Sequence, residues 1–201
     1  MTLPPIHPIE EESYRILASR VDLERWPPRC RAVVSRVIHA AADVGYADTL
    51  VLDEASCAAG VEALRAGAPV IADVEMVAVG ARRSGATSYL AEGRALRAAV
   101  DEPDLTISAA AIRVAAERFP EGAVVAVGNA PTALFEVVRL AAAGRFAPAL
   151  VIGLPVGFVG AAESKAALRE SGLPAISNIG ERGGSAVTAA ALNALHRLAS
   201  S

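Results

Sequence analysis

His39 is the side chain whose type and surroundings best suit acid–base chemistry. It falls in a segment whose apolar residues repeat at helical spacing, and it lies off that apolar stripe. On a helix its neighbours are Ser35 and Arg36 one turn earlier and Asp43 one turn later. The two charges would act on the protonation of the imidazole in opposite directions. Proton transfer is the natural reaction for such a group, although a single helical histidine is also a common structural residue.

The remaining histidines and the cysteines do not suggest a second reactive centre. His7 lies in a proline-flanked N-terminal segment and His196 in the last turn of an expected helix, so both are expected at the surface. Cys30 and Cys57 form neither a disulfide framework nor a ligand pair with metal spacing, which predicts buried or idle thiols. We therefore expect no metal site.

Three glycine-rich junctions suit an anionic ligand. They are Gly128–Thr132, Gly153–Gly160 and Gly180–Ser185, and each stands where a strand is expected to end and a helix to begin. Glycine lets a ligand approach the backbone, and free N–H groups at a helix start attract anions. Two junctions are associated with a cation, because Arg182 lies in the third and Lys165 lies just inside the helix that follows the second. Neither the P-loop pattern nor the dinucleotide fingerprint occurs, so the ligand is not an obvious nucleotide. The three junctions together favour a polyanionic ligand over glycines that serve only to form tight turns.

Composition places these residues in one compact domain. The 201 residues are 53% hydrophobic and 20% charged, which excludes a disordered chain. The net charge of −3 predicts no nucleic-acid partner. No apolar run reaches the ~20 residues of a spanning helix, so no membrane partner is expected. The first twenty residues lack the pattern of a secretion signal, which favours the cytoplasm. Lys165 is the only lysine among nineteen basic residues, so arginines supply the rigid carboxylate-binding forks.

Short β-branched runs alternate with alanine-rich helical patterns, which predicts an α/β fold with a mostly parallel sheet flanked by helices. Expected strands are Thr49–Leu52, Pro69–Ala72, Thr87–Leu90, Ala123–Val127, Ala149–Ile152 and Ala175–Ser177. Expected helices are Glu54–Ala66, Leu105–Arg118, Pro131–Ala143, Gly160–Glu170 and Gly184–Leu198. Two N-terminal helices, Ile9–Arg20 and Pro28–Asp43, precede the first strand, after a short arm of residues 1–8. The three junctions then meet at the carboxyl ends of the strands, where such sheets bind ligands.

Several sequence blocks run in order from about Ile9 to Leu195, and the most specific are Asn129–Thr132 and Pro155–Lys165. The others are Ser13–Leu17, Arg36–His39 with Ala42–Asp43, Gly67–Val70 with Asp73 and Met76, Gly128 and Ala133–Phe135 on either side of the first specific block, Arg182–Ala186 and Ala190–Asn193. Together these blocks resemble the precorrin-8X methylmutase family of the cobalamin pathway, which includes cobalt-precorrin-8 methylmutases.

The resemblance implies an isomerase that shifts a methyl group from C11 to C12 of a corrin-like ring, formally a 1,5-sigmatropic rearrangement. Precorrin-8X would become hydrogenobyrinate, or cobalt-precorrin-8 would become cobyrinate. His39 matches the family's proton donor or acceptor. The resemblance also implies a homodimer with active sites near the subunit interface, no separate cofactor, and a small-molecule tetrapyrrole substrate, with hand-over to neighbouring pathway enzymes.

The substrate contacts that follow are partly carried over from the family and partly taken from the glycine-rich junctions. They are Ser13, Arg15, Gly128, Asn129, Thr132, Gly157, Gly160, Ser164, Lys165, Arg182, Gly183, Gly184 and Ser185. Simpler roles remain open for several of them. Asn129 and Thr132 would also suit helix caps, and Lys165 would suit a solvated surface cation. Asp73 and Glu75 are candidates for subunit contacts.

One position departs from the family pattern. Ile107 stands in Thr106–Ala109, where the family commonly has arginine, and Arg82, Arg83 or Arg113 is a candidate substitute. Two other function classes stay open beside the isomerase. A non-catalytic tetrapyrrole or corrinoid carrier would keep the anion-binding loops without needing His39. A nucleotide- or cofactor-dependent transferase is disfavoured by the missing fingerprints.

Overall fold

The computed structural model describes residues 7–201, so residues 1–6 of the expected N-terminal arm lie outside the described range. All six strands belong to one sheet with the order β1-β6-β5-β4-β2-β3. They are β1 (Leu50–Leu52), β2 (Val70–Ala72), β3 (Thr87–Ser88), β4 (Val124–Val127), β5 (Leu150–Gly153) and β6 (Ala175–Asn178). β1 runs antiparallel to β6, and the other neighbouring strands are parallel. The predicted α/β class with a mostly parallel sheet is confirmed.

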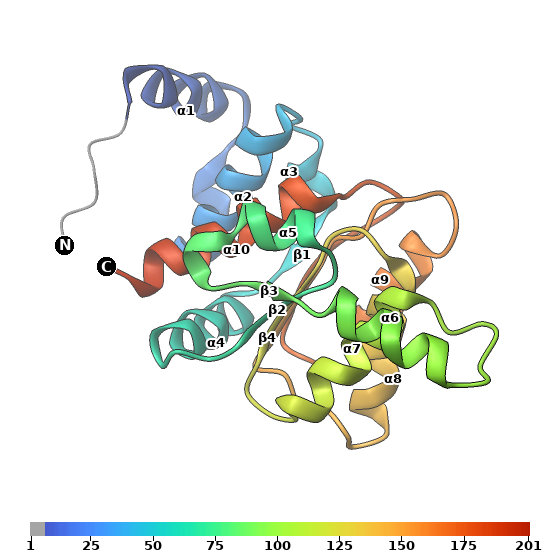
Figure 1. Ribbon diagram of the computed structural model, residues 1–201. Coiled ribbons are helices and arrows are strands. Elements are labelled where there is room, and N and C mark those ends of the chain that lie inside the picture. The colour runs from blue at the N-terminus through green and yellow to red at the C-terminus, as the bar shows by residue number, and fades with distance from the viewer. Residues whose placement is uncertain (1–6) are drawn as a thin grey trace.

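Helices cover both faces of the sheet (Figure 1). One face carries α2 (Pro28–Ala41), α3 (Tyr46–Thr49), α4 (Glu54–Arg65), α5 (Glu75–Gly80) and α10 (Ser185–Ala199), with α1 (Pro8–Arg20) against α2. The other face carries α6 (Leu90–Ala99), α7 (Ile107–Arg118), α8 (Pro131–Ala142) and α9 (Ala161–Glu170). Short 3-10 turns occupy Leu23–Arg25 and Arg82–Ser84. The two predicted N-terminal helices precede β1, as expected.

The central strands show why the sequence folds in three layers. In β4, Val124 and Ala126 pack into one core, whereas Val125 and Val127 pack into the core on the opposite face. All four residues are fully buried. Successive side chains of a strand point to opposite faces, so an uninterrupted apolar run needs helices on both sides. Every strand end at the carboxyl edge therefore leads into a covering helix.

Local structure differs from the expectations around residue 90. The strand predicted over Thr87–Leu90 ends at Ser88, and Leu90 begins α6, which was not expected. Gly93 lies inside α6 because a Cβ there would stand 2.5 Å from Ala111 N and 2.7 Å from Ile107 O of α7. Here glycine marks a close helix–helix approach and does not break the helix.

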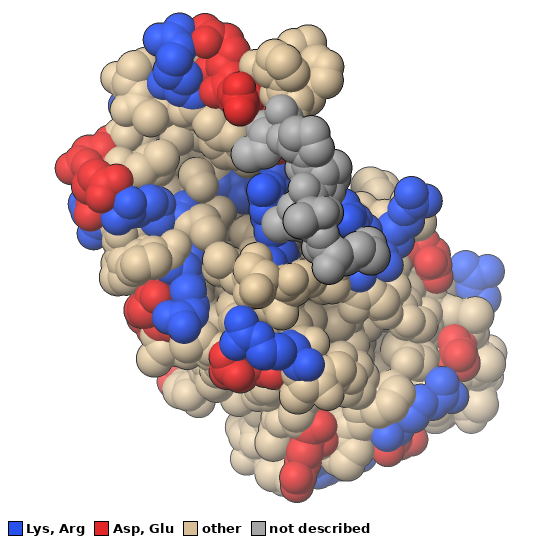
Figure 2. All heavy atoms as spheres, turned by 90° about the vertical axis from the view of Figure 1, so that its left-hand side faces the viewer, with Lys and Arg blue, Asp and Glu red and all other residues tan. Residues whose placement is uncertain are grey.

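The surface carries charges of both signs, as the similar numbers of basic and acidic residues in the sequence predict. Basic and acidic side chains are interspersed around the face that forms the left-hand side of Figure 1, as Figure 2 shows. None of the described helices is both long enough and apolar enough to cross a bilayer.

Candidate functional site

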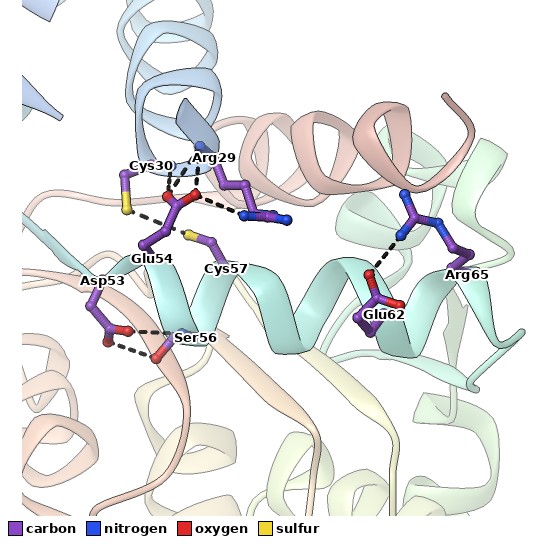
Figure 3. Close-up of polar contacts among 8 residues, drawn as sticks. All are labelled: Arg29, Cys30, Asp53, Glu54, Ser56, Cys57, Glu62 and Arg65. Carbon is purple, nitrogen blue, oxygen red and sulfur yellow. Dashed lines mark hydrogen bonds and ion pairs between the residues drawn. The ribbon is translucent and has the colours of Figure 1, made fainter. Parts of the chain in front are cut away.

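The helix that carries His39 is held at its start by a side chain from α4. Pro27, at the N-cap of α2, supplies no side-chain hydrogen bond. Glu54 accepts hydrogen bonds there from the backbone N–H groups of Arg29 (3.1 Å) and Cys30 (3.2 Å) and pairs with the Arg29 guanidinium at 2.9 Å (Figure 3). A carboxylate at this position satisfies free N–H groups and complements the helix dipole. α2 is thereby fixed to α4 before the chain reaches His39.

Cys30 on α2 and Cys57 on α4 lie opposite each other where the same two helices meet (Figure 3). Their Sγ atoms lie 3.9 Å apart, and both side chains are buried. Burial raises the pKa of the Cys30 thiol to about 11 and raises that of Cys57 further. Thiols that stay protonated are poor nucleophiles, and the prediction of buried thiols is confirmed.

The end of α2 differs from the prediction. The helix stops at Ala41, and Ala42 adopts a left-handed conformation with φ of 51°. Asp43 therefore leaves the helix, where its carboxylate pairs with the Arg182 guanidinium and accepts from the Gly45 N–H at 2.8 Å. The expectation that Asp43 stands one helical turn beyond His39 is wrong. The structure instead joins Arg182, a predicted substrate contact, to the end of the helix that carries His39.

His39 is half-buried beneath α1. Its Nδ1 lies 2.9 Å from the Ser13 hydroxyl, and the Tyr14 ring stacks on the imidazole with centroids 4.8 Å apart and an interplanar angle of 17°. Across the part of the chain that is described, no group hydrogen-bonds to Nε2. Two residues predicted separately, Ser13 as a substrate contact and His39 as the acid–base group, are thus in direct contact. The sequence analysis missed Tyr14, whose only signal was its place beside Ser13.

In the first glycine-rich junction, the backbone N–H groups bind a carboxylate of the protein itself. Asp73, after β2, is fully buried and accepts hydrogen bonds from the N–H groups of Gly128 (3.0 Å), Asn129 (2.8 Å) and Ala130 (2.8 Å). Burial raises the pKa of Asp73 above its ordinary value, while these three donors act in the opposite direction. The suggested role of Asp73 in subunit contacts is wrong, because a side chain with no exposed surface cannot touch another subunit.

The side chains of the first junction take no part in the hydrogen bonds between its backbone and Asp73, which together form the Asp73 cluster. Asn129 is exposed, and the Thr132 hydroxyl lies 2.8 Å from that of Thr106, the N-cap of α7. This contact brings the start of α7, including the half-exposed Ile107, beside the start of α8. Arg113, a candidate substitute for an arginine at position 107, is paired with Glu102 (2.8 Å) and Glu136 (2.6 Å).

The second and third junctions are bonded to each other. The Gly157 N–H donates to Glu181 O at 3.2 Å, and the Gly184 N–H donates to Leu154 O at 2.8 Å. Gly183 passes so close to this segment that a Cβ would stand 2.2 Å from Leu154 O. Gly128 likewise presses on α10, where a Cβ would stand 3.0 Å from Ser185 Cα. The three junctions therefore form one continuous edge, as the parallel sheet predicts.

Two predicted contacts of α9 are buried beneath that edge. The Ser164 hydroxyl donates to Ala161 O at 3.0 Å. The Lys165 ammonium donates to Asn178 Oδ1 (3.1 Å) and Arg182 O (2.6 Å), and the side chain has no exposed surface. Burial lowers the pKa of Lys165 to about 8. The reading of Lys165 as a surface cation is therefore wrong, and its contacts anchor the loop that presents Arg182.

Exposed apolar side chains accompany the polar ones at this edge. Phe158 is 91% and Val159 89% exposed, and Gly160, with φ of 77°, lets the chain turn directly after them. Phe135 and Ile179 are also exposed on the neighbouring junctions. Large exposed apolar side chains in such numbers indicate a surface that binds an apolar ligand or another protein.

The outlying candidates are less connected. Arg15 is exposed on α1 and pairs with Glu12 at 2.6 Å, away from His39's ring contacts. His7 caps α1 and is exposed, whereas His196 is half-buried near the end of α10. Within residues 7–201, no group of three or more His, Cys, Asp or Glu side chains is placed to hold a metal ion.

Comparisons with known proteins agree on one family. The profile of the family described as Precorrin-8X methylmutase matches residues 8–198. The Precorrin-8X methylmutase of Sinorhizobium sp is 42% identical over 94% of this chain and 93% of its own length. The Cobalt-precorrin-8 methylmutase of Priestia megaterium is 37% identical over 96% and 88%. The crystal structure of Precorrin-8x Methyl Mutase from Thermus thermophilus superimposes with a TM-score of 0.82 and 38% identity over 95% of both chains. The resemblance is confirmed, and the chain belongs to the precorrin-8X methylmutase family, the methyl-shifting isomerases of cobalamin biosynthesis.

Proposed function

We propose that this protein moves a methyl group from C11 to C12 of precorrin-8X or cobalt-precorrin-8, with His39 as the acid–base group. The observation that carries the proposal is the state of the His39 ring. Ser13 engages Nδ1 at 2.9 Å, and Nε2 has no hydrogen-bond partner among residues 7–201. One nitrogen is thus held by the protein while the other can face a substrate.

The Ser13 hydroxyl suits both halves of a proton cycle. The hydroxyl can accept from Nδ1–H both in the imidazolium and in the neutral ring that keeps its proton on Nδ1. Nε2–H of the imidazolium would donate a proton to the conjugated macrocycle, which favours the electronic form from which the methyl migrates, and the neutral Nδ1–H ring would remain. After migration the same nitrogen would take the proton back, so the net change is only the position of the methyl. One positioned acid–base group contributes about 10²–10⁴-fold.

Substrate binding is proposed at the carboxyl edge of the sheet. Phe158, Val159 and Ile179 offer apolar surface to the ring, and the precorrin carboxylates require cations or N–H donors. Arg182 meets the second need, because its ion pair with Asp43 is half-exposed and can be shared with a ligand carboxylate. Asn129, Thr132, Gly157, Gly160 and Ser185 belong to the same edge, whereas Ser164 and Lys165 support it from below.

Further proposals concern partners and place. We infer a homodimer and hand-over of the tetrapyrrole between pathway enzymes in the cytoplasm. The exposed Phe158–Val159 tip supports an extended contact, since two neighbouring side chains of that size rarely face water without a ligand or a second subunit.

The test is the visible spectrum of precorrin-8X, and separately of its cobalt form, mixed anaerobically with protein. We expect the wild type to convert at least one form to the product chromophore, and His39→Ala to bind it while converting it at least about 100-fold more slowly. His196→Ala is the matched control, because it removes a half-buried helical histidine elsewhere and should convert at the wild-type rate.

Two results would overturn the proposal. Conversion by His39→Ala at the wild-type rate would remove His39 from the mechanism. Binding of both substrates without conversion by the wild type would instead make the protein a tetrapyrrole carrier.

A further inference from the structure

We propose that Tyr14, Arg36 and Glu10 are positioning residues that hold the His39 ring in its reactive orientation, an inference that rests on the proposed acid–base role of His39. Tyr14 stacks on the imidazole. Arg36 Nη1 donates to the Tyr14 hydroxyl at 3.1 Å and to Glu10 Oε1 at 2.8 Å.

The four side chains form two facing pairs. Glu10 and Tyr14 are one turn apart on α1, and Arg36 and His39 are one turn apart on α2. Residues at these spacings lie on one face of a helix. Arg36 reaches across to Glu10, and Tyr14 reaches back across to His39. The ion pair therefore fixes the position of α1, and α1 in turn fixes the aromatic ring that covers the imidazole.

Stacking limits the rotation that Ser13 alone would permit. A single hydrogen bond at Nδ1 leaves the imidazole plane free to tilt, whereas a parallel ring at 4.8 Å restricts that tilt. With the plane fixed, Nε2 points in one direction. Small displacements of a reacting group cost large factors in rate, so this restriction acts on turnover more than on binding.

The experiment compares Tyr14→Leu, Tyr14→Phe, Arg36→Met and Glu10→Gln with a matched control, Arg31→Met. Arg31 is also an α2 arginine that pairs with a glutamate across helices, Glu24 at 2.6 Å, but it contacts neither Tyr14 nor His39. For each protein, kcat and KM are measured with the converted precorrin, and the chemical shifts of the His39 ring protons are recorded by NMR without substrate.

We expect Tyr14→Leu to lower kcat about tenfold with KM changed less than about twofold, and Tyr14→Phe, which keeps the stack, to retain kcat within about threefold. The ring-current shift that the Tyr14 stack imposes on the His39 ring protons should be lost in Tyr14→Leu, kept in Tyr14→Phe, and reduced in Arg36→Met and Glu10→Gln, which loosen α1. Arg31→Met should leave all of these values unchanged.

Equal effects of Tyr14→Leu and Arg31→Met on kcat, or His39 ring-proton shifts that are the same in Tyr14→Leu and wild type, would overturn the positioning role. If His39→Ala were fully active, the proposed function would fail, and the ring-proton shifts would still decide whether Tyr14 holds the His39 ring.

Discussion

The turn at Gly128–Ala130 and the surroundings of His39 both combine a helix end with polar groups at one edge of the sheet. In the turn, three N–H donors converge on the buried Asp73 carboxylate, so the protein itself supplies the anion. Around His39, Ser13 engages only Nδ1, and the ring is half-buried with Nε2 unpartnered among the described residues. The first region is satisfied internally, and the second leaves one polar atom for a ligand.

The difference shows what distinguishes a structural polar cluster from a candidate reactive one. Buried donors almost always have partners, and a partner provided by the fold removes the donor from ligand binding. Glycine-rich turns therefore indicate a ligand site only where their N–H groups stay free. At this edge, the side chains of Asn129, Thr132 and Arg182 are better candidates than the backbone of the first turn.

The largest expected effect tests the turn at Gly128–Ala130, whose N–H donors are bound by Asp73. Asp73→Ala leaves three buried donors without an acceptor, so we expect the free energy of unfolding to fall by about 3–5 kcal/mol in urea denaturation. Asp53→Ala, which removes the exposed N-cap of α4, should cost only about 1 kcal/mol. A stable Asp73→Ala protein with a raised KM would mean that the turn binds substrate and would reverse the comparison.

A second buried charge, Lys165, extends the comparison through pH. Its pKa is lowered from 10.5 to about 8 in the folded protein, so between these values the unfolded chain binds more protons and stability rises with pH. The difference in unfolding free energy between wild type and Lys165→Met should change by about 3 kcal/mol from pH 8 to 10.5. Both proteins retain Cys30 and Cys57, so their titration cancels. A pH-independent difference would show that Lys165 reaches solvent.

A substitution at Ser13 tests the surroundings of His39, where Nε2 is left without a partner among the described residues. Ser13→Ala removes the partner of His39 Nδ1, and we expect kcat to fall about tenfold while the unfolding free energy stays within about 0.5 kcal/mol of wild type. Ser19→Ala is the control, because that exposed hydroxyl of α1 bonds only to Ile16 O at 2.7 Å. A loss of stability without a change in kcat would make Ser13 a structural residue like Asp73.

The smallest expected effect tests whether an exposed side chain next to the Asp73-bound turn binds substrate. Thr132 starts α8 beside the Asp73 cluster, but its side chain is exposed. Thr132→Ala should raise KM about threefold, the effect of one neutral hydrogen bond, with kcat and stability nearly unchanged. The N-cap variant Thr106→Ala should instead lose about 1 kcal/mol of stability. An unchanged KM in Thr132→Ala would assign the whole turn to structure.

Much of the fold followed from local patterns. The apolar runs at β4 and β5 predicted buried parallel strands, because only a sheet covered on both faces tolerates them. α6 was missed because Gly93 lowers helix propensity, and its reason, the backbone of α7, is distant in the sequence. The antiparallel direction of β1 was equally out of reach, since three residues carry no sign of the strand they pair with.

The sequence by itself determined the fold class and the family and singled out His39 as the candidate acid–base residue, because apolar periodicity and motif order are properties of neighbouring residues. Tertiary structure alone decided which polar groups are free. Asp73 meets a turn 55 residues away, Lys165 reaches Arg182 O 17 residues away, and Tyr14 covers His39 on another helix. Hydrogen bonds and stacking act over a few ångströms, so these partnerships exist only once packing has brought distant segments together.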